Sequence, residues 1–249
     1  MNPYFTLLRA NRNFRLLFIG QTISQLGDWF NAVAVFALLL DLTGSATAVA
    51  WMMIVQILPI ALVAPVSGVV VDRMDRRKLM IAADVVRGCL ILGLLLVREA
   101  DQVWIAYVVM ALTVAAAAFF EPARTAIIPS FTTAEELLPA NALSSATWSA
   151  MLAIGASVGG VVTAIAGRNV AFAVNAASFF VSAFFIGRTR YRPAPVTASR
   201  PSGVAALSGY TDLIEGLQYM RRHSHVDHIG GYEPHLGMMG RVFRLEDDL

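Results

Sequence analysis

Long apolar segments alternate with short charged ones from residue 16 to residue 187. Six segments are long enough to cross a lipid bilayer as helices: residues 16–40, 46–71, 79–97, 103–120, 142–167 and 169–187. The hydrocarbon core is about 30 Å thick, so a helix that rises about 1.5 Å per residue needs about 20 apolar residues to span it. The pattern predicts an all-α membrane protein with six transmembrane helices.

The composition agrees with a membrane location. Hydrophobic residues make up 57% of the chain and charged residues 14%, whereas soluble domains carry about 25% charged residues. The first apolar segment is longer than the apolar core of a secretory signal peptide, about 7–15 residues, so we expect it to remain as a membrane helix. The net charge of +2 predicts no nucleic-acid partner, and the lone Cys89 offers no disulfide framework.

The basic residues predict the orientation in the membrane. They gather before the first segment, after the second, after the fourth and after the sixth: Arg9, Arg12, Arg15, Arg73, Arg76, Arg77, Lys78, Arg124, Arg188, Arg190, Arg192 and Arg200. The opposite loops carry Arg98 and Arg168. Because cytoplasmic loops are enriched in basic residues, we expect the N-terminus and the chain after the sixth helix to face the cytoplasm, in a bacterial cytoplasmic (inner) membrane.

The composition changes after residue 191. We expect a six-helix transmembrane bundle over residues 1–191, then a cytoplasmic linker and a short amphipathic helix over residues 192–222. Residues 223–249 lack a long apolar run and contain all four histidines. They form an atypical polar tail, for which a frameshifted or truncated reading frame is the simplest account.

The first predicted helix carries a polar stripe. Its members fall within an arc of about 120° at 100° per residue: Gln21, Ser24, Gln25, Asp28 and Asn31. Polar groups in a span seldom face lipid, so the stripe predicts a bundle interior or a water-filled cavity. Asp28 is a candidate for proton or cation coupling or for contact with a cationic substrate. The alternative is a carboxylate that hydrogen-bonds a neighbouring helix for packing.

Two other helices carry informative residues. Asp84 and Arg87 are three residues apart in the third helix, which predicts an intramembrane ion pair near the cytoplasmic end, where both can partly snorkel. A role in gating is the alternative. In the fifth helix, Gly155, Gly159 and Gly160 predict close helix packing. In the second, Pro59 and Pro65 predict a kink.

A charged motif follows the second helix. Gly68, Asp72, Arg73, Arg76 and Arg77, called here the gate motif, have the spacing Gly-x-x-x-Asp-Arg-x-x-Arg-Arg. This spacing resembles the loop between helices 2 and 3 of major facilitator superfamily transporters. The segments 11–15, 20–28, 43–46, 58–68, 140–143 and 215–222 are similar to the bacterial drug and siderophore efflux branch, which includes macrolide and enterobactin exporters. The resemblance covers about residues 9 to 222.

The resemblance implies the N-terminal half of a major facilitator fold, built from two inverted three-helix repeats. It implies efflux of a hydrophobic drug-like or siderophore-like solute by alternating access coupled to an ion gradient, with no enzymatic activity and no cofactor. Gln21, Gln25 and Asp28 would line the cavity, and the gate motif would close the cytoplasmic side. The expected partners are membrane lipid, a small-molecule substrate, and a C-terminal half or a second copy of the chain.

The sequence departs from the family pattern in three ways. The predicted fourth helix, 103–120, contains no arginine, and Ala156 stands where drug antiporters usually have a proline. Family members have twelve helices, whereas six are found here, so we expect a half-transporter that is inactive alone. A membrane protein that assembles with others without transporting is the alternative.

The polar tail contains a possible metal site. His223, His225, Asp227 and His228 have the His-x-His-x-Asp-His spacing of zinc-dependent metallo-β-lactamase-fold hydrolases. That fold needs an apolar strand before the motif and further ligands far downstream. A helix-like segment precedes the motif, and the chain ends at residue 249. We therefore expect no dedicated metal site. Zinc hydrolysis, or adventitious zinc binding by the tail, is the alternative.

Overall fold

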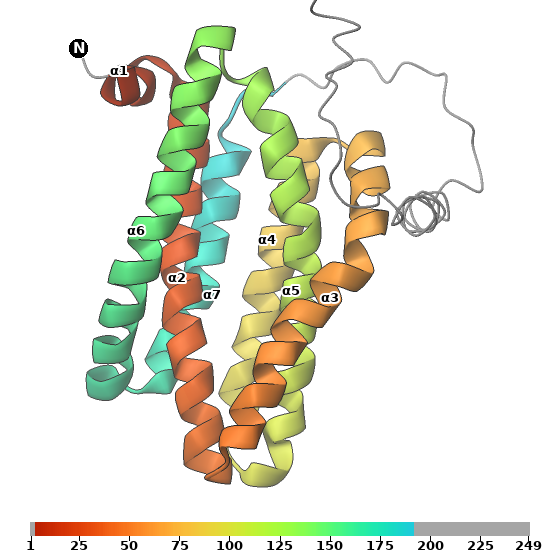
Figure 1. Cartoon of the computed structure of the whole chain (residues 1–249), viewed down its shortest axis with the longest axis vertical. Coiled ribbons are helices and arrows are strands. Elements are labelled where there is room, and N and C mark those ends of the chain that lie inside the picture. Colours follow the sequence, from red (N-terminus) through yellow and green to blue (C-terminus); the bar gives the residue numbers. More distant parts are fainter. Residues whose placement is uncertain (1–2, 192–249) are drawn as a thin grey trace, which may run out of the picture. The chain divides into compact units, whose positions relative to one another are not determined.

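The computed structural model describes residues 3–191. The helices follow in the order α1 (Pro3–Ala10), α2 (Arg12–Thr43), α3 (Ala46–Arg73), α4 (Arg76–Leu92), α5 (Val103–Ile127), α6 (Ala134–Ala166) and α7 (Arg168–Gly187), with short 3₁₀ turns at Gly93–Leu96, Ala100–Gln102 and Ile128–Ser130. Six of these, with α4 extended to Leu96, are long and apolar enough to cross a membrane, which confirms the predicted number of spans (Figure 1). The predicted linker and helix (192–222) and tail (223–249) lie outside the described residues.

Side chains and glycines mark the helix ends. Asn11 Oδ1 accepts a hydrogen bond from the Phe14 backbone amide (3.0 Å) and begins α2. Gly44, at φ 61°, ends α2 in the left-handed conformation that glycine adopts without strain. Thr133 and Glu136 form a reciprocal capping box at the start of α6. Gly44 thus separates two helices whose apolar segments almost run together in the sequence.

Two predicted boundaries are wrong. The fourth span continues beyond residue 120 to Ile127, and the fifth begins at Ala134 rather than at residue 142. An apolar run stops at its first charged residue, but a backbone helix can continue into the interface when its charges pair along the helix. Glu121 and Arg124 do so, with Arg124 Nη2 2.8 Å from Glu121 Oε2. The fourth helix therefore carries an arginine, contrary to the prediction.

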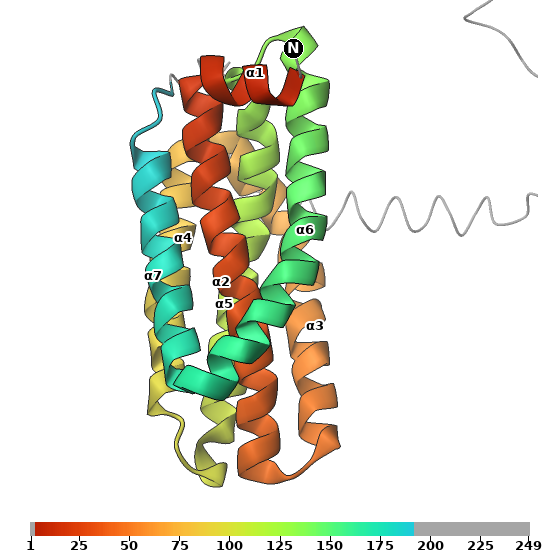
Figure 2. The ribbon, with the colours of Figure 1, turned by 90° about the vertical axis from the view of Figure 1, so that its left-hand side faces the viewer.

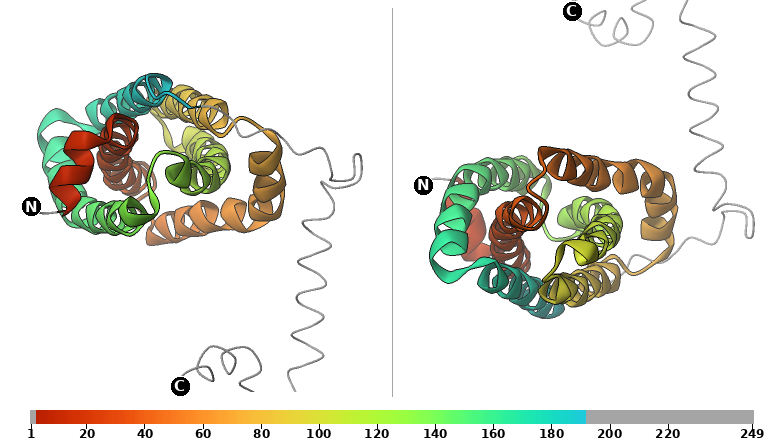
Figure 3. Two further views of the ribbon diagram at one scale, coloured as in Figure 1. Left: turned by 90° about the horizontal axis from the view of Figure 1, so that it is seen from above. Right: turned by 90° about the horizontal axis from the view of Figure 1, so that it is seen from below.

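The six spanning helices pack with an internal symmetry. Helix α2 packs against α7 and α6, α5 packs against α4 and α3, and α4 packs against α7. Exchanging α2 with α5, α3 with α6 and α4 with α7 leaves this set of contacts unchanged. Seen along the helices, α4 and α7 form one side and α3 and α6 the other, with α2 and α5 between them (Figure 3). This arrangement is the one expected of two inverted three-helix repeats.

The buried apolar side chains form two clusters. One joins the ends of α2 and α5 that lie near the α2–α3 connection and includes Phe30, Leu38 and Phe172. The other lies at the opposite end of the bundle and includes Phe14 and Phe120. Between them, the helices carry the polar residues described below. The apolar core is thus interrupted by a polar layer.

Helices α3 and α6 expose most of their apolar surface. In α3 the buried residues are Met52, Ser67 and Val71, and in α6 they are Ala140, Gly155 and Gly159. Large exposed side chains on α3 include Ile57 and Leu58. Figure 1 shows that α3, which contains Pro59 and Pro65, changes direction along its length as predicted. These two faces are available to lipid or to other helices.

Candidate functional site

The polar layer lies where α2, α4, α5 and α7 meet. Its buried polar side chains come from these four helices: Gln21, Ser24, Asn31, Asp84, Arg87, Thr113, Asn175, Ser178 and Ser182. Each is held on a helix whose remaining surface is apolar, so the membrane fixes its depth while helix packing fixes its direction. In hydrocarbon, polar groups need partners inside the protein, and these residues are turned into the bundle interior.

Asp84 and Arg87 form the predicted ion pair in the centre of the layer. Arg87 Nη2 donates to Asp84 Oδ1, and the side chains are 6% and 0% exposed, respectively. The Arg87 guanidinium carbon also lies 4.1 Å from the ring centre of Phe179 in α7 and 4.7 Å from that of Phe120 in α5. The expected snorkelling of the two side chains is not found, because Arg87 is held between these rings. The pair connects three helices.

The layer also contains buried polar atoms without a protein partner among residues 3–191. They include Arg87 Nε in α4 and Asn31 Oδ1 in α2. An unpaired polar atom is costly in a low-dielectric interior. The layer can therefore accept a proton, a water molecule or a rearranged hydrogen bond.

The polar stripe of α2 reaches Arg124. With the Gln21 amide in the orientation that satisfies its neighbours, its oxygen accepts from Arg124 Nε at 2.9 Å and from Gln25 Nε2 at 3.2 Å. Arg124 lies within α5 rather than in the connection expected from the sequence, so this contact is not predicted by the apolar pattern. The three-residue spacing of Glu121 and Arg124 is the sequence signal that the helix continues past residue 120.

Asp28 lies on the same stripe as Gln21 and Gln25 and is partly exposed. The charges close enough to act on its carboxyl group are those of Arg87, Asp84 and Glu121. Asp28 thus shares an electrostatic environment with the buried ion pair, although it stands on a different helix. A change in the charge of Asp28 would be felt by Arg87, which carries the opposite charge.

Two of the three predicted packing glycines lie at a helix interface. A Cβ atom on Gly155 would stand 2.7 Å from Trp29 Cβ, and one on Gly159 would stand 3.0 Å from Phe30 Cα, so α6 approaches α2 closely at both positions. The prediction is wrong for Gly160. No atom of another described helix lies within 4 Å of its Cβ position, because it faces away from α2.

These glycines give a matched test. We expect Gly155→Ala to lower the free energy of unfolding by about 1–3 kcal/mol, because the added methyl group overpacks the contact with Trp29. Gly160→Ala should be neutral or stabilising by up to about 1 kcal/mol, because alanine favours the helix and meets no atom. Unfolding in detergent micelles measures both. Equal losses in the two variants would contradict the packing assignment.

The gate motif divides into two parts. Arg76 Nη1 donates to the Ala126 carbonyl at 2.8 Å, and Arg77 donates to the carbonyls of Ile186 (3.1 Å, from Nε) and Gly187. These arginines satisfy carbonyl groups at the ends of α5 and α7, where a helix dipole favours cations. Asp72 and Arg73 are exposed at the end of α3, and Gly68 has open space at its Cβ position.

Asp41 has a cationic partner that the sequence did not indicate. Its Oδ2 lies 3.0 Å from Arg168 Nη1, which joins the last turns of α2 to the start of α7. Asp41 lies in the last turn of α2. The two residues are far apart in sequence, and both are partly exposed.

Metal binding finds no further support in the described part of the chain. Residues 3–191 contain no group of three histidine, cysteine, aspartate or glutamate side chains that could hold a metal ion. The candidate ligands His223, His225, Asp227 and His228 lie outside these residues.

Comparison with known proteins shows which family and relatives the chain is similar to. The family model for transmembrane secretion effectors matches residues 5–226. The uncharacterized MFS-type transporter YfiS of Bacillus subtilis is 29% identical over 87% of this chain and 51% of its own length. BacE of the same species, named as a proposed bacilysin exporter, is 27% identical over 86% and 52%.

A third relative is macrolide efflux protein A of Streptococcus pyogenes, which is 30% identical over 50% of this chain and 31% of its own length. No solved structure matches. The chain spans about half the length of YfiS and BacE. With its six apolar helices, it is a multi-pass membrane protein, and it belongs to the major facilitator superfamily of transporters, in the family of transmembrane secretion effectors.

Proposed function

We propose that the chain forms the N-terminal half of an exporter that moves a hydrophobic, drug-like or siderophore-like solute out of a bacterial cell by alternating access. The polar layer between two apolar clusters supports this proposal most directly. A membrane bundle needs no such layer for stability, and ionisable residues inside a membrane mark ion or substrate pathways. The efflux functions in the names of BacE and macrolide efflux protein A agree with export.

Each part of the half has a role in this proposal. Apolar parts of the solute contact those exposed side chains of α3 and α6 that the second half leaves uncovered, while Gln25, which is partly exposed, offers a hydrogen bond from α2. Asp28 exchanges the coupling ion. Because Asp28 acts electrostatically on the Asp84–Arg87 pair, its charge can bias the packing of α4 against α5 and α7. That bias would link ion exchange to helix movement.

Alternating access needs a second wall. The exposed faces of α3 and α6 are the surfaces on which a C-terminal half, or a second copy of the chain, would pack. Exposed apolar faces of this extent lie against lipid or protein. We favour a C-terminal half, because the relatives are about twice as long as the matched region.

The test joins the chain to the C-terminal half of macrolide efflux protein A and measures erythromycin accumulation in an efflux-deficient bacterium. We expect the joined protein to lower accumulation and the chain alone to leave it unchanged. Equal export by the chain alone would show that self-association completes the transporter. If the joined protein inserts in the membrane but exports neither erythromycin nor any of a panel of hydrophobic organic cations, the proposed export function is contradicted.

The orientation is a separate prediction. After Cys89→Ser, single cysteines at Lys78 and Arg188 should react with a membrane-impermeant maleimide from the cytoplasmic side, and one at Ser45 from outside. Lys78 and Arg188 are exposed among the basic residues, whereas Ser45 precedes α3 at the other end of the bundle. Labelling of positions 45 and 78 from the same side would contradict the topology.

The gate motif gives another prediction. In the joined protein, Asp72→Asn should reduce transport strongly, because Asp72 is exposed beside a basic cluster at the end of α3. Asp41→Asn should change transport little, because it removes a partly exposed ion pair with Arg168, a kind of pair worth about 0–1 kcal/mol. Initial efflux rates at equal expression measure both, and equal rates would remove the gate role of Asp72.

A further inference from the structure

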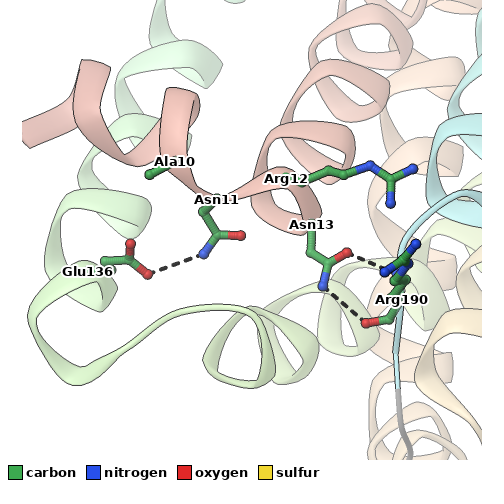
Figure 4. Close-up of a pocket in the computed structure, with 6 residues that line it drawn as sticks. All are labelled: Ala10, Asn11, Arg12, Asn13, Glu136 and Arg190. Carbon is green, nitrogen blue, oxygen red and sulfur yellow. Dashed lines mark hydrogen bonds between the residues drawn. The ribbon is translucent and has the colours of Figure 1, made fainter.

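A polar pocket of about 350 Å³ lies at the end of the bundle where the described chain begins and ends. Its walls come from the α1–α2 junction, the start of α6 and the segment after α7 (Figure 4). The lining residues are Ala10, Asn11, Arg12, Asn13, Glu136 and Arg190. No step of the proposed transport uses this pocket. The pocket is therefore a candidate for a function separate from transport.

Two asparagines fix the walls of the pocket. Asn13 Nδ2 donates to the Arg190 carbonyl at 3.0 Å, and the Arg190 amide donates to Asn13 Oδ1 at 2.9 Å. This reciprocal pair holds the backbone of Arg190 beside the start of α2, next to Arg12. Asn11 Nδ2 donates to the Phe131 carbonyl at 2.5 Å, which holds the start of α6 against the same junction.

The charges of the pocket are unequally satisfied. Glu136 Oε2 accepts from Asn11 Nδ2 at 3.2 Å and from the Thr133 amide at 3.1 Å, so this carboxylate already has donors. Within residues 3–191, the guanidinium groups of Arg12 and Arg190 donate to no carboxylate or carbonyl, although both line the pocket. Guanidinium groups form paired hydrogen bonds with phosphate oxygens. The pocket thus has donors and a net positive charge for an anion.

Helix α1 places this pocket at the membrane surface. It lies across the end of the bundle rather than along it (Figure 2). Leu7 is buried against the bundle at 2% exposure, whereas Tyr4 and Phe5 are 41% and 62% exposed. A short amphipathic helix with exposed aromatic residues is typical of the bilayer interface, where lipid headgroups lie. The α1–α2 junction opens directly into the pocket.

We propose that the pocket binds the phosphate of an anionic phospholipid, with Arg12 and Arg190 as its ligands and Asn13 as the residue that positions Arg190. The interfacial position of α1 favours a lipid over a soluble anion, because the headgroup phosphate reaches the pocket while the acyl chains stay in the bilayer. This site is independent of the solute path and of the proposed transport.

The test uses the full chain in detergent, mixed with equal amounts of phosphatidylglycerol and phosphatidylcholine that have the same acyl chains. Native mass spectrometry should show phosphatidylglycerol retained about tenfold more than phosphatidylcholine. Both lipids carry the phosphate, but the choline cation of phosphatidylcholine cancels the headgroup charge and is repelled by the two guanidinium groups. Arg12→Gln combined with Arg190→Gln should bring the ratio near one. Asn13→Ala should lower it, because Arg190 loses its anchor. Lys78→Gln, an exposed cation outside the pocket, should leave the ratio unchanged.

The controls distinguish the sources of the phosphate. Inorganic phosphate in millimolar excess should not displace phosphatidylglycerol, and displacement would show a soluble-anion site instead. Equal retention of the two lipids by the unaltered chain would overturn the proposal without relying on any variant. An equal loss of the preference for phosphatidylglycerol in Lys78→Gln would also overturn the proposal, because the general positive charge of this membrane face, rather than the pocket, would then select the lipid.

Discussion

Replacing Arg87 with methionine is expected to lower the free energy of unfolding by about 3–5 kcal/mol, because the change leaves Asp84 as a buried carboxylate without its cation. Asp84 is 0% exposed and cannot recover water. The loss of the guanidinium contacts with Phe120 and Phe179 adds to the effect. Reversible unfolding of the purified chain in mixed micelles, titrated with dodecyl sulfate, measures the change.

Two further variants make this prediction specific. Asp84→Leu combined with Arg87→Met should recover most of the lost stability, because replacing both members of a buried ion pair by apolar groups removes the desolvation cost. Arg168→Met breaks the pair with Asp41, whose side chains are 27% and 64% exposed, and should cost at most about 1 kcal/mol. If Arg87→Met and Arg168→Met had the same free energy of unfolding, the Asp84–Arg87 pair would behave like the exposed pair, and the prediction of a buried ion pair would be wrong.

Asp28→Asn is expected to reduce ion-driven transport by the joined protein to background while leaving it inserted and folded. Asp28 is the acidic member of the α2 polar stripe, and asparagine keeps its size but cannot exchange a proton or bind a cation as a carboxylate does. It is partly exposed and acts electrostatically on Arg87, so a change in its charge is felt by the buried pair. Uptake into inverted vesicles with an imposed pH gradient measures the effect.

The matched control for this variant is Asp41→Asn, the same chemical change in the same helix. Asp41 lies at the far end of α2 and pairs with Arg168, outside the polar layer. The Asp41→Asn variant should transport at nearly the rate of the unaltered protein. A wild-type rate with an unchanged pH profile in Asp28→Asn would make Asp28 a packing residue.

Local information in the sequence determined the membrane-spanning helices. Hydrophobic length predicted six spans, and the helical period placed Asp84 next to Arg87 and put Gln21, Gln25 and Asp28 on one face. These features depend on residues a few positions apart, which the helix itself brings together. The motif spacings indicated the superfamily for the same reason, since they are local patterns. The sequence alone therefore determined the helices and the candidate faces.

The tertiary structure decided how those faces meet. Arg124 reaches Gln21, Arg77 reaches the end of α7, Asp41 pairs with Arg168, and Asn13 holds Arg190. These partners lie on different helices, and the sequence period of one helix carries no information about the rotation of another. Gly160 shows the same limit: its spacing matches a packing motif, but helix packing turned it away from α2. The polar layer exists because four helices turn their polar residues toward the same interior, which only their packing could set.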